Sequence, residues 1–86
     1  MMFIVEGTVK RPVAVAEERA SSAWLGPMAD RGFFHGGWVD ASRSRVWMVV
    51  SAPDLAEARE LISDLPLARD GSVSFDLTPV ETLRTS

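Results

Sequence analysis

One histidine, His35, is the side chain of this sequence best suited to acid–base chemistry. An imidazole changes charge near neutral pH, so it can remove a proton from a substrate and return it. The segment from Phe33 to Ser51 reads as two strands joined by the polar turn ASRS, and a pair between Asp40 and Arg45 would place opposite charges across that turn. In this register His35 shares one face with aliphatic side chains, those of Val39, Val46, Met48 and Val50. This predicts a base between apolar walls; the alternatives are a structural histidine bonded to a backbone carbonyl and a histidine in water at a strand end.

Two glycines follow His35 directly, and they affect this prediction. Gly36 and Gly37 would weaken the interior of a strand, where glycine often marks a bulge or a close approach of a ligand to the backbone. A bulge would reverse the face on which His35 lies. The sequence leaves both readings open.

Further candidates come from the segment before this hairpin. Trp24, Met28 and Phe33 are predicted to line an apolar pocket between a helix and the sheet, although each can equally be plain core. Arg31 and Ser21 can hold a carboxylate or an enolate oxygen, the alternative being a solvated helix face. Glu17 and Glu18 are expected on the surface, and either becomes a second acid or base only if the helix turns it inward.

The elements that must position these residues follow from local patterns. The chain is expected to begin with a strand over 2–10, followed by a helix after Pro12 that kinks or stops at Gly26-Pro27 and ends at Gly32. The central hairpin comes next, and then a helix from the N-cap Asp54 to Pro66. A loop over 67–71, a strand over 72–80 and a tail complete the chain. The core-facing stripe of the first helix is predicted at Ala16, Ala20, Ala23 and Trp24.

This order is the βαββαβ pattern of a ferredoxin-like α+β fold, a four-stranded antiparallel sheet with both helices on one face. The helix-facing side is predicted to carry the aliphatic parity of all strands, including Phe3, Val5, Met48, Val50, Val73, Phe75 and Leu77. The other side would expose Phe34, Trp38 and Trp47 next to charged residues. Such a patch is typical of an interface, so we expect a second copy to pack sheet against sheet.

Composition restricts the possible functions. The chain has 86 residues, 47% hydrophobic and 24% charged, which fits a single domain over 1–86 with residues 79–86 as a C-terminal arm. It has no cysteine and one histidine, which argues against thiol chemistry and against a histidine-cluster metal site. The net charge of −3 with scattered basic residues does not favour nucleic-acid binding. The apolar start MMFIV is too short for a signal sequence, and no run is long enough for a membrane span, so we expect a cytoplasmic protein.

The sequence resembles the muconolactone isomerase family of the dimeric α+β-barrel superfamily. The resemblance rests on the opening MFIVEGTVK, on His35 followed closely by Trp38, and on the stretch from Asp54 to Pro79 with its DLPL and LTP motifs. The chain departs from the family pattern at Gly26-Pro27 and in having no tyrosine.

The resemblance implies a cofactor-independent isomerase or cyclase, with neither metal nor organic cofactor, that moves a proton on an unsaturated lactone or a polyketide-like carbonyl compound. It also implies a homodimer or a larger ring of dimers, with His35 as the proton shuttle in a pocket on the helix side; a site inside the barrel between subunits is the rival location. The alternatives are a cofactor-free monooxygenase acting on an aromatic polyphenol and a binding or assembly subunit without chemistry. Heme handling with His35 as an axial ligand is disfavoured only weakly.

Overall fold

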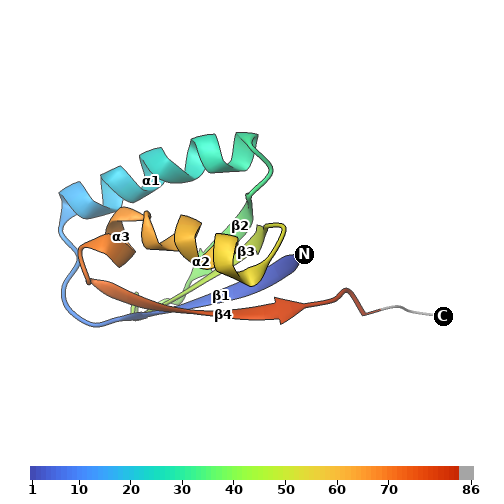
Figure 1. The fold of residues 1–86 in the computed structure, drawn as a ribbon. Coiled ribbons are helices and arrows are strands. Elements are labelled where there is room, and N and C mark those ends of the chain that lie inside the picture. The colour runs from blue at the N-terminus through green and yellow to red at the C-terminus, as the bar shows by residue number, and fades with distance from the viewer. Residues whose placement is uncertain (84–86) are drawn as a thin grey trace.

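The computed structural model describes residues 1–83, which form one four-stranded sheet and three helices. The elements are β1 (Met2–Val9), α1 (Val15–Asp30), β2 (Phe34–Val39), β3 (Arg45–Ser51), α2 (Leu55–Ser63), α3 (Pro66–Arg69) and β4 (Val73–Val80). The strands are antiparallel in the order β2-β3-β1-β4, and the helices lie on one face of the sheet (Figure 1). The predicted ferredoxin-like α+β architecture is confirmed.

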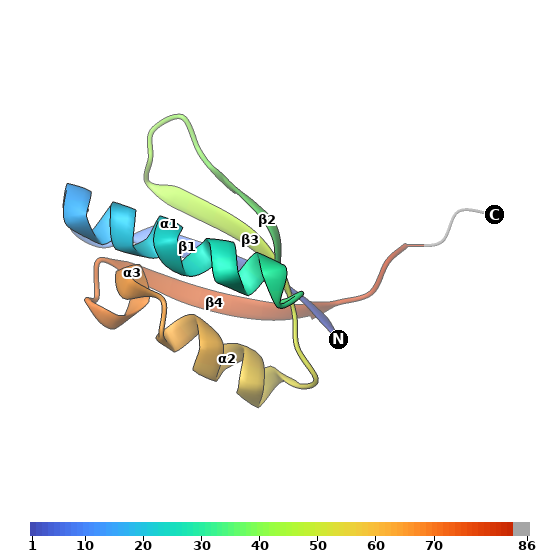
Figure 2. The same ribbon diagram turned by 90° about the horizontal axis from the view of Figure 1, so that it is seen from above.

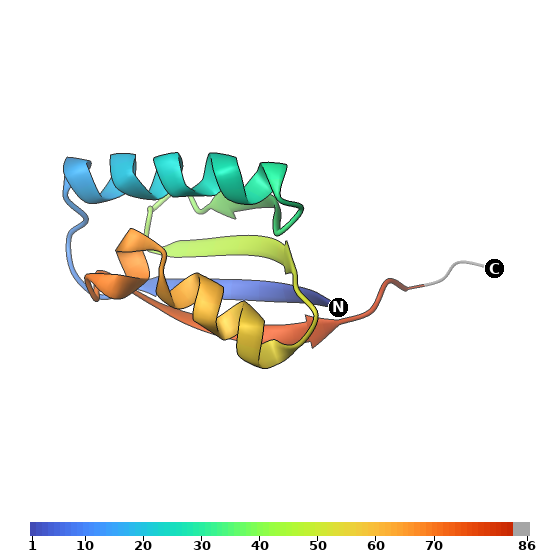
Figure 3. The same cartoon turned by 45° about the horizontal axis from the view of Figure 1, so that its top comes forward.

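The core lies between the sheet and the helices. Its buried members come from β1, β3, α2, β4 and the loops between elements: Phe3, Val5, Phe33, Met48, Val50, Ala52, Ala58, Ile62, Leu65 and Val73. On the strands these are the residues of the predicted helix-facing parity, and the register agrees, because Val5 lies opposite both Met48 and Leu77. Within residues 1–83 no helix covers the other face of the sheet, which is called the open face below (Figure 3).

Helix α1 has the predicted ends but differs from the prediction in the middle. It begins at Val15, after Pro12, and the Glu17 carboxylate accepts the backbone N–H of the N-cap residue Ala14 at 3.3 Å. It runs through Gly26-Pro27 without stopping, so the predicted stop at this step is wrong, while the alternative of a kink stays a prediction. The turn that contains Pro27 still closes, because its carbonyl accepts the N–H of Arg31 at 3.0 Å. The predicted left-handed cap is confirmed, with φ of 79° at Gly32.

The face that α1 turns to the sheet also differs from the predicted alanine stripe. Ala16, Ala20 and Ala23 are exposed, whereas Ser21 is buried and Trp24, Leu25 and Met28 pack partly buried against the core. Alanine gains little from burial, so the larger side chains determine the orientation of this helix.

The second helical region is confirmed at its start and corrected at its end. The Asp54 carboxylate accepts the N–H of Glu57 at 2.8 Å, as an N-cap does. Helix α2 ends at Ser63, and Pro66 opens the short helix α3 in place of the predicted loop, because proline suits the first turn of a helix.

The chain end differs from the prediction as well. Pro79 and Val80 pair with Phe3 and Met2 as part of β4, so the predicted arm over 79–86 starts two residues later. Residues 81–83 continue away from the sheet (Figure 1), and residues 84–86 lie outside the part that the structure describes.

Candidate functional site

A bulge in β2 sets the positions of Phe34 and His35. Phe34 lies opposite Val50, but Gly36 lies opposite Val49, so one extra residue is inserted between them. Gly36 has φ of 153°, a conformation that favours glycine. The bulge was one of the two readings of the His-Gly-Gly step, and it reverses the faces of the two residues before it.

Phe34 consequently packs partly buried against the core on the helix side, and its predicted place on the interface face is wrong. His35 lies on the open face, where it is exposed and its Nε2 lies 2.6 Å from the hydroxyl oxygen of Ser51. The prediction that His35 faces the helices is therefore wrong, and His35 lines neither of the two cavities between the sheet and the helices that are described below.

The helix side nevertheless contains the predicted kind of pocket. A cavity of about 480 Å³ lies between α1 and the strands β2 and β3, and we call it the α1 cavity. It is lined by apolar and aromatic residues with a few polar ones, which is typical of small-molecule sites: Val9, Pro12, Val13, Glu18, Ser21, Ser22, Leu25, Phe34, Gly37, Trp38, Val39, Arg43, Val46, Trp47, Met48, Leu67 and Val73.

Gly37 lines this cavity on the sheet side, at a point where β2 has no room for a side chain. A Cβ atom at Gly37 would lie 2.8 Å from the carbonyl oxygen of Trp47 and 3.2 Å from Cγ of Met48. The first distance is too short for a side chain because the neighbouring atom is backbone, whereas the second would only require the Met48 side chain to shift. The absence of a Cβ atom at Gly37 therefore lets β2 and β3 pair closely under the cavity.

Two opposite charges meet at the rim of the α1 cavity. A guanidinium nitrogen of Arg43, in the β2–β3 turn, donates to Oε1 of Glu18 on α1 at 2.9 Å. Figure 2 shows this turn on the same side as the first half of α1. Both side chains line the cavity, yet they are 66% and 55% exposed, so the ion pair lies between the cavity and solvent. Sequence reasoning missed this pair, since 25 residues separate the two charges.

Asp40 holds the turn that carries Arg43. Its carboxylate accepts the hydroxyl of Ser42 at 2.6 Å and the backbone N–H groups of Ser44 and Arg45 at 2.8 and 3.0 Å. These bonds, that from Ser42 first, lower the pKa of Asp40 from 3.8 to about 2. Arg43 has φ of 59°, so a left-handed residue lies at the tip of this turn.

The predicted charge pair between Asp40 and Arg45 takes another form. The two residues do face each other, since the Asp40 N–H donates to the Arg45 carbonyl at 3.1 Å. The Arg45 guanidinium, however, donates to Glu6 on β1 at 2.7 Å and lies over the ring of Trp47, 5.3 Å from its centroid. The predicted facing of Trp38 and Trp47 is confirmed by the register.

The other predicted pocket residues separate into two groups. Ser21 lines the α1 cavity, and its hydroxyl accepts the N–H of Leu67 at 3.3 Å, which ties α1 to α3. Trp24 and Phe33 pack edge to face with centroids 6.1 Å apart, and they pack with Met28 in the core, outside the cavity lining. Arg31 is exposed and its guanidinium lies 3.8 Å from the sulfur of Met28, also away from the cavity.

Glu17 was expected on the surface, but the helix turns it inward. Its carboxylate accepts the hydroxyl of the buried Ser72 and the guanidinium of Arg11, the latter at 3.2 Å. The bond from Ser72 is the main reason why the pKa of Glu17 lies below its usual value. With these partners Glu17 joins the start of α1 to the start of β4, a structural role.

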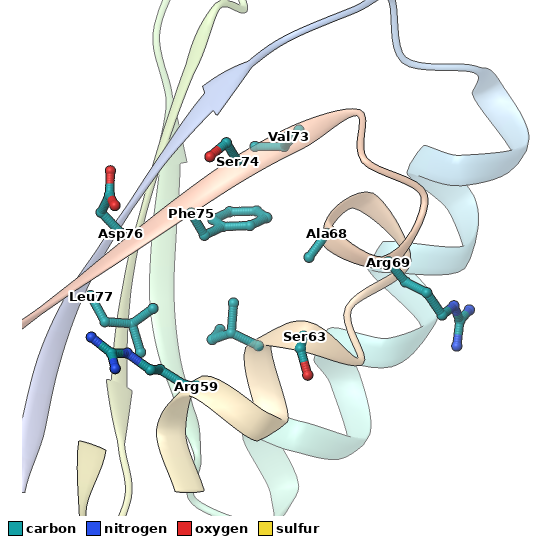
Figure 4. A pocket seen from close by; sticks show the side chains of 10 residues that line it. Arg59, Ser63, Ala68, Arg69, Val73, Ser74, Phe75, Asp76 and Leu77 are labelled. Carbon is teal, nitrogen blue, oxygen red and sulfur yellow. The ribbon is translucent and has the colours of Figure 1, made fainter. Parts of the chain in front are cut away.

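A second cavity of about 560 Å³ lies between β4 and the helices α2 and α3. Figure 4 shows Phe75 and Ala68 directed into it, while the Arg69 guanidinium points away. Asp76 follows Phe75 on β4 and therefore points to the opposite face of the sheet. Asp76 is the one acidic residue among those that line this cavity, and its carboxylate is directed away from it (Figure 4), which makes the α1 cavity the better candidate for acid–base chemistry.

Within residues 1–83, no group of three or more histidine, aspartate or glutamate residues is arranged to hold a metal ion. In the same range, no helix has the length and hydropathy needed to cross a membrane.

Comparison with known proteins links this fold to two enzymes. No protein-family model matches the chain, and no curated protein sequence matches it either. Among solved structures, muconolactone isomerase is similar with a TM-score of 0.78 and 20% identity, over 100% of this chain and 94% of that one. The 5-chloro-2-hydroxyhydroquinone dehydrochlorinase of Burkholderia phenoliruptrix, solved in complex with 2,5-dihydroxybenzoquinone, has a TM-score of 0.75 and 15% identity, over 94% of both chains.

At these identities the likeness defines the fold. The chain thus has the fold of muconolactone isomerase, and the resemblance inferred from its sequence motifs is confirmed at that level.

Proposed function

We propose that this chain is a cofactor-independent enzyme that moves a proton on a small unsaturated carbonyl compound bound in the α1 cavity. The observation that carries the proposal is an apolar cavity of about 480 Å³ whose rim holds a carboxylate and a guanidinium 2.9 Å apart. Such a cavity suits a ring-sized apolar substrate. The paired charges supply what proton transfer needs, a base and a cation to stabilise the developing oxyanion.

The proposed reaction uses only groups of this chain and the substrate. The Glu18 carboxylate removes a proton from the carbon next to the carbonyl, and the electron pair moves onto the carbonyl oxygen as an enolate. Arg43 stabilises that negative charge. Glu18 then returns the proton further along the conjugated system, so the double bond moves and no oxidant, reductant or water is consumed.

Two similar structures support this class of substrate. One is an isomerase of a lactone by its name, and the other was solved with a dihydroxybenzoquinone. The lactone and the dihydroxybenzoquinone are both small cyclic compounds with several oxygen atoms. Compounds of this kind suit the size and the mostly apolar lining of the α1 cavity. We therefore place the substrate among unsaturated lactones and related cyclic carbonyl compounds of aromatic breakdown.

We also propose that the chain acts as a homodimer joined through the open face. Trp38 is 64% exposed there, and Met2, on the same sheet, is 38% exposed. Exposed tryptophan is typical of the residues that carry interface affinity. A second copy packed sheet against sheet would cover it.

The open face is the rival location for the chemistry, because His35 and Ser51 form a hydrogen-bonded pair there. In that case the base would be His35, inside the barrel that two sheets would form. We prefer the α1 cavity because it provides a binding volume next to the acid–cation pair within a single chain.

The test is proton exchange with solvent. Wild-type protein is incubated in deuterium oxide with a panel of five-membered unsaturated lactones, and deuterium uptake and double-bond position are followed by NMR. Glu18→Gln should lower the rate about a hundredfold, because it removes the base and retains the shape of the side chain. Glu60→Gln, an exposed acid on α2, is the matched control and should leave the rate unchanged. Equal rates for Glu18→Gln and wild type would remove Glu18 from the reaction.

A further inference from the structure

Two polar side chains of the described residues are buried, and they use their hydroxyl protons differently. Ser72 is 0% exposed and donates its proton to the Glu17 carboxylate. Ser21, on α1, is 4% exposed, and its hydroxyl oxygen accepts the N–H of Leu67 at 3.3 Å. A hydroxyl has one proton to donate in addition to its lone pairs, and within residues 1–83 the Ser21 proton has no acceptor.

The position of Ser21 inside a helix makes this unused donor unusual. A serine in a helix commonly donates to a backbone carbonyl one turn earlier, as Ser63 of α2 does to Glu60 at 2.6 Å. Ser21 forms no such bond with any residue of the described range. A buried donor without an acceptor is unfavourable, so we expect its partner to come from the space beside it. That space is the α1 cavity, which Ser21 lines.

Ser21 lies deeper in the α1 cavity than the ion pair at the rim. The side chains of Glu18 and Arg43 are 55% and 66% exposed. Ser22 is exposed too, so Ser21 is the only buried hydroxyl or charged group among the described residues that line the cavity. Glu18 and Ser21 are three residues apart on α1, which places their Cβ atoms about 5–6 Å from each other on one side of the helix. A ring-sized ligand can therefore contact both.

We infer that Ser21 donates a hydrogen bond from its hydroxyl to the carbonyl oxygen of the bound substrate. A carbonyl oxygen accepts hydrogen bonds and has no proton to offer, so it suits a hydroxyl that already accepts from Leu67 and whose proton is unused. This inference rests on the proposed function for the choice of cavity and substrate, and it adds a catalytic residue to that reaction.

Ser21 would act at the atom on which the negative charge develops. When Glu18 removes the proton, the electron pair moves onto the carbonyl oxygen, and the bond from Ser21 becomes stronger because its acceptor becomes charged. Arg43 supplies the positive charge from the rim, and Ser21 supplies a donor from the buried wall. The same bond fixes the ring, so that the carbon next to the carbonyl faces Glu18.

The first test is binding of two probes that differ in the lactone group. Coumarin is a flat unsaturated lactone, and naphthalene has nearly the same shape without any oxygen. Both are titrated into isotope-labelled protein, and their dissociation constants are taken from the backbone amide shifts in NMR spectra. Ser21→Ala should weaken binding of coumarin about five- to tenfold, and it should leave the dissociation constant of naphthalene within about twofold.

Two further measurements distinguish a bond to the substrate from a structural role of Ser21. The carbonyl stretch of bound coumarin, measured by difference infrared spectroscopy, should move to higher wavenumber in Ser21→Ala, because a hydrogen bond to this oxygen is lost. In the deuterium-exchange assay, Ser21→Ala should lower kcat about tenfold or more, since the donor binds the enolate oxygen most strongly. Loss of the contact with Leu67 alone would not shift the carbonyl stretch.

Substitutions of similar size keep the test independent of folding. Ser21→Cys retains the shape and offers a weaker donor, so it should behave like Ser21→Ala. Ser21→Thr retains the hydroxyl and should recover part of the coumarin binding and of the infrared shift. Ser63→Ala removes a helical hydroxyl outside the α1 cavity, and it should leave the binding of both probes and kcat unchanged. Circular dichroism checks the fold of each variant.

The outcomes separate this inference from the proposed function. If Ser21→Ala and Ser21→Cys bind coumarin as wild type does, with an unshifted carbonyl stretch, the inference is overturned, while a loss of exchange in Glu18→Gln would leave the proposed function standing. Equal weakening of coumarin and naphthalene would also overturn it, because that result indicates a structural role. If the stretch depends on Ser21 but wild type exchanges no lactone, the proposed reaction falls and the hydrogen bond stands. If wild type does not bind coumarin, the inference falls.

Discussion

The two faces of the sheet are built from the same strands, but they differ in what covers them and in which groups they present. The helix side holds a core with side chains that are 0–8% exposed, together with the α1 cavity and its rim ion pair. The open face carries an exposed tryptophan, the pair of His35 with Ser51, and the ion pair of Glu6 with Arg45. Within one chain, the buried core and the α1 cavity therefore lie on the helix side, and the exposed tryptophan lies on the open face.

Two neighbouring residues on β1 allow the packing of the two faces to be compared. Their substitution by alanine is expected to give the largest change in stability of the predictions made here. Phe3 is fully buried on the helix side, and Ile4, on the open face, is partly buried. Phe3→Ala should cost about 3–5 kcal/mol of unfolding free energy because it leaves a cavity in the core, and Ile4→Ala only about 1–2 kcal/mol. Urea denaturation measures both, in a Trp38→Asp background that excludes stabilisation by a second copy. Equal losses would show that the two faces are equally packed.

The next effect concerns the open face in the proposed homodimer. A carboxylate buried in an apolar interface is strongly unfavourable, so Trp38→Asp should raise the dissociation constant of the dimer about a hundredfold or more. Sedimentation velocity over a concentration series measures this. Ala23→Asp places the same group at an exposed position of α1 and should leave the association unchanged. A wild-type chain that sediments as a single subunit at all concentrations would refute the dimer.

The next prediction compares substitutions of two glycines and tests the close pairing of β2 with β3. Gly37→Ala should destabilise the fold by about 1–3 kcal/mol, because its Cβ would meet the carbonyl of Trp47 at 2.8 Å. Gly26→Ala is the matched control in α1, where nothing lies within 4 Å of the new methyl group. That change should stabilise the protein by about 0.5–1 kcal/mol, since alanine favours helix. Thermal unfolding compares the two, and a neutral Gly37→Ala would contradict the close strand pairing under the cavity.

The smallest effect is that of pH on the turn that carries Arg43. The pKa of Asp40 is lowered to about 2 in the folded chain, so its ionised form stabilises the fold above pH 3.8, its ordinary value. That contribution is lost as the pH falls from 3.8 through about 2, when the carboxylate becomes protonated. The difference in melting temperature between wild type and Asp40→Asn should therefore shrink over this interval. A constant difference between pH 5 and pH 2 would show that the carboxylate charge is not what holds the turn.

The fold could be predicted well from the sequence, because strand alternation is a local signal. The apolar parity of Phe3, Val5, Met48 and Val50 predicted the helix-facing side. The pairing of Trp38 with Trp47 followed from placing Asp40 opposite Arg45 across the turn. The α1 orientation was predicted less well, since three alanines at helical spacing indicated a core stripe that burial of larger side chains overrides.

The candidate site was harder to predict, for two physical reasons. One inserted residue at Gly36 moved His35 to the open face and Phe34 to the core, and a bulge leaves only a weak signal in the sequence. The contact of Arg43 with Glu18 joins a turn to a helix and depends on tertiary geometry alone. The predicted pocket between helix and sheet is present, but of the residues predicted to line it only Ser21 does so.

The central claim is that the chemistry takes place on the helix side, and turnover of two matched variants tests it most directly. Rates of proton exchange on an unsaturated lactone are measured for Glu18→Gln and His35→Gln under the same conditions. We predict a loss of about a hundredfold for Glu18→Gln and a change of less than about threefold for His35→Gln. The reverse pattern, a hundredfold loss for His35→Gln with Glu18→Gln close to wild type, would contradict the claim and place the reaction on the open face.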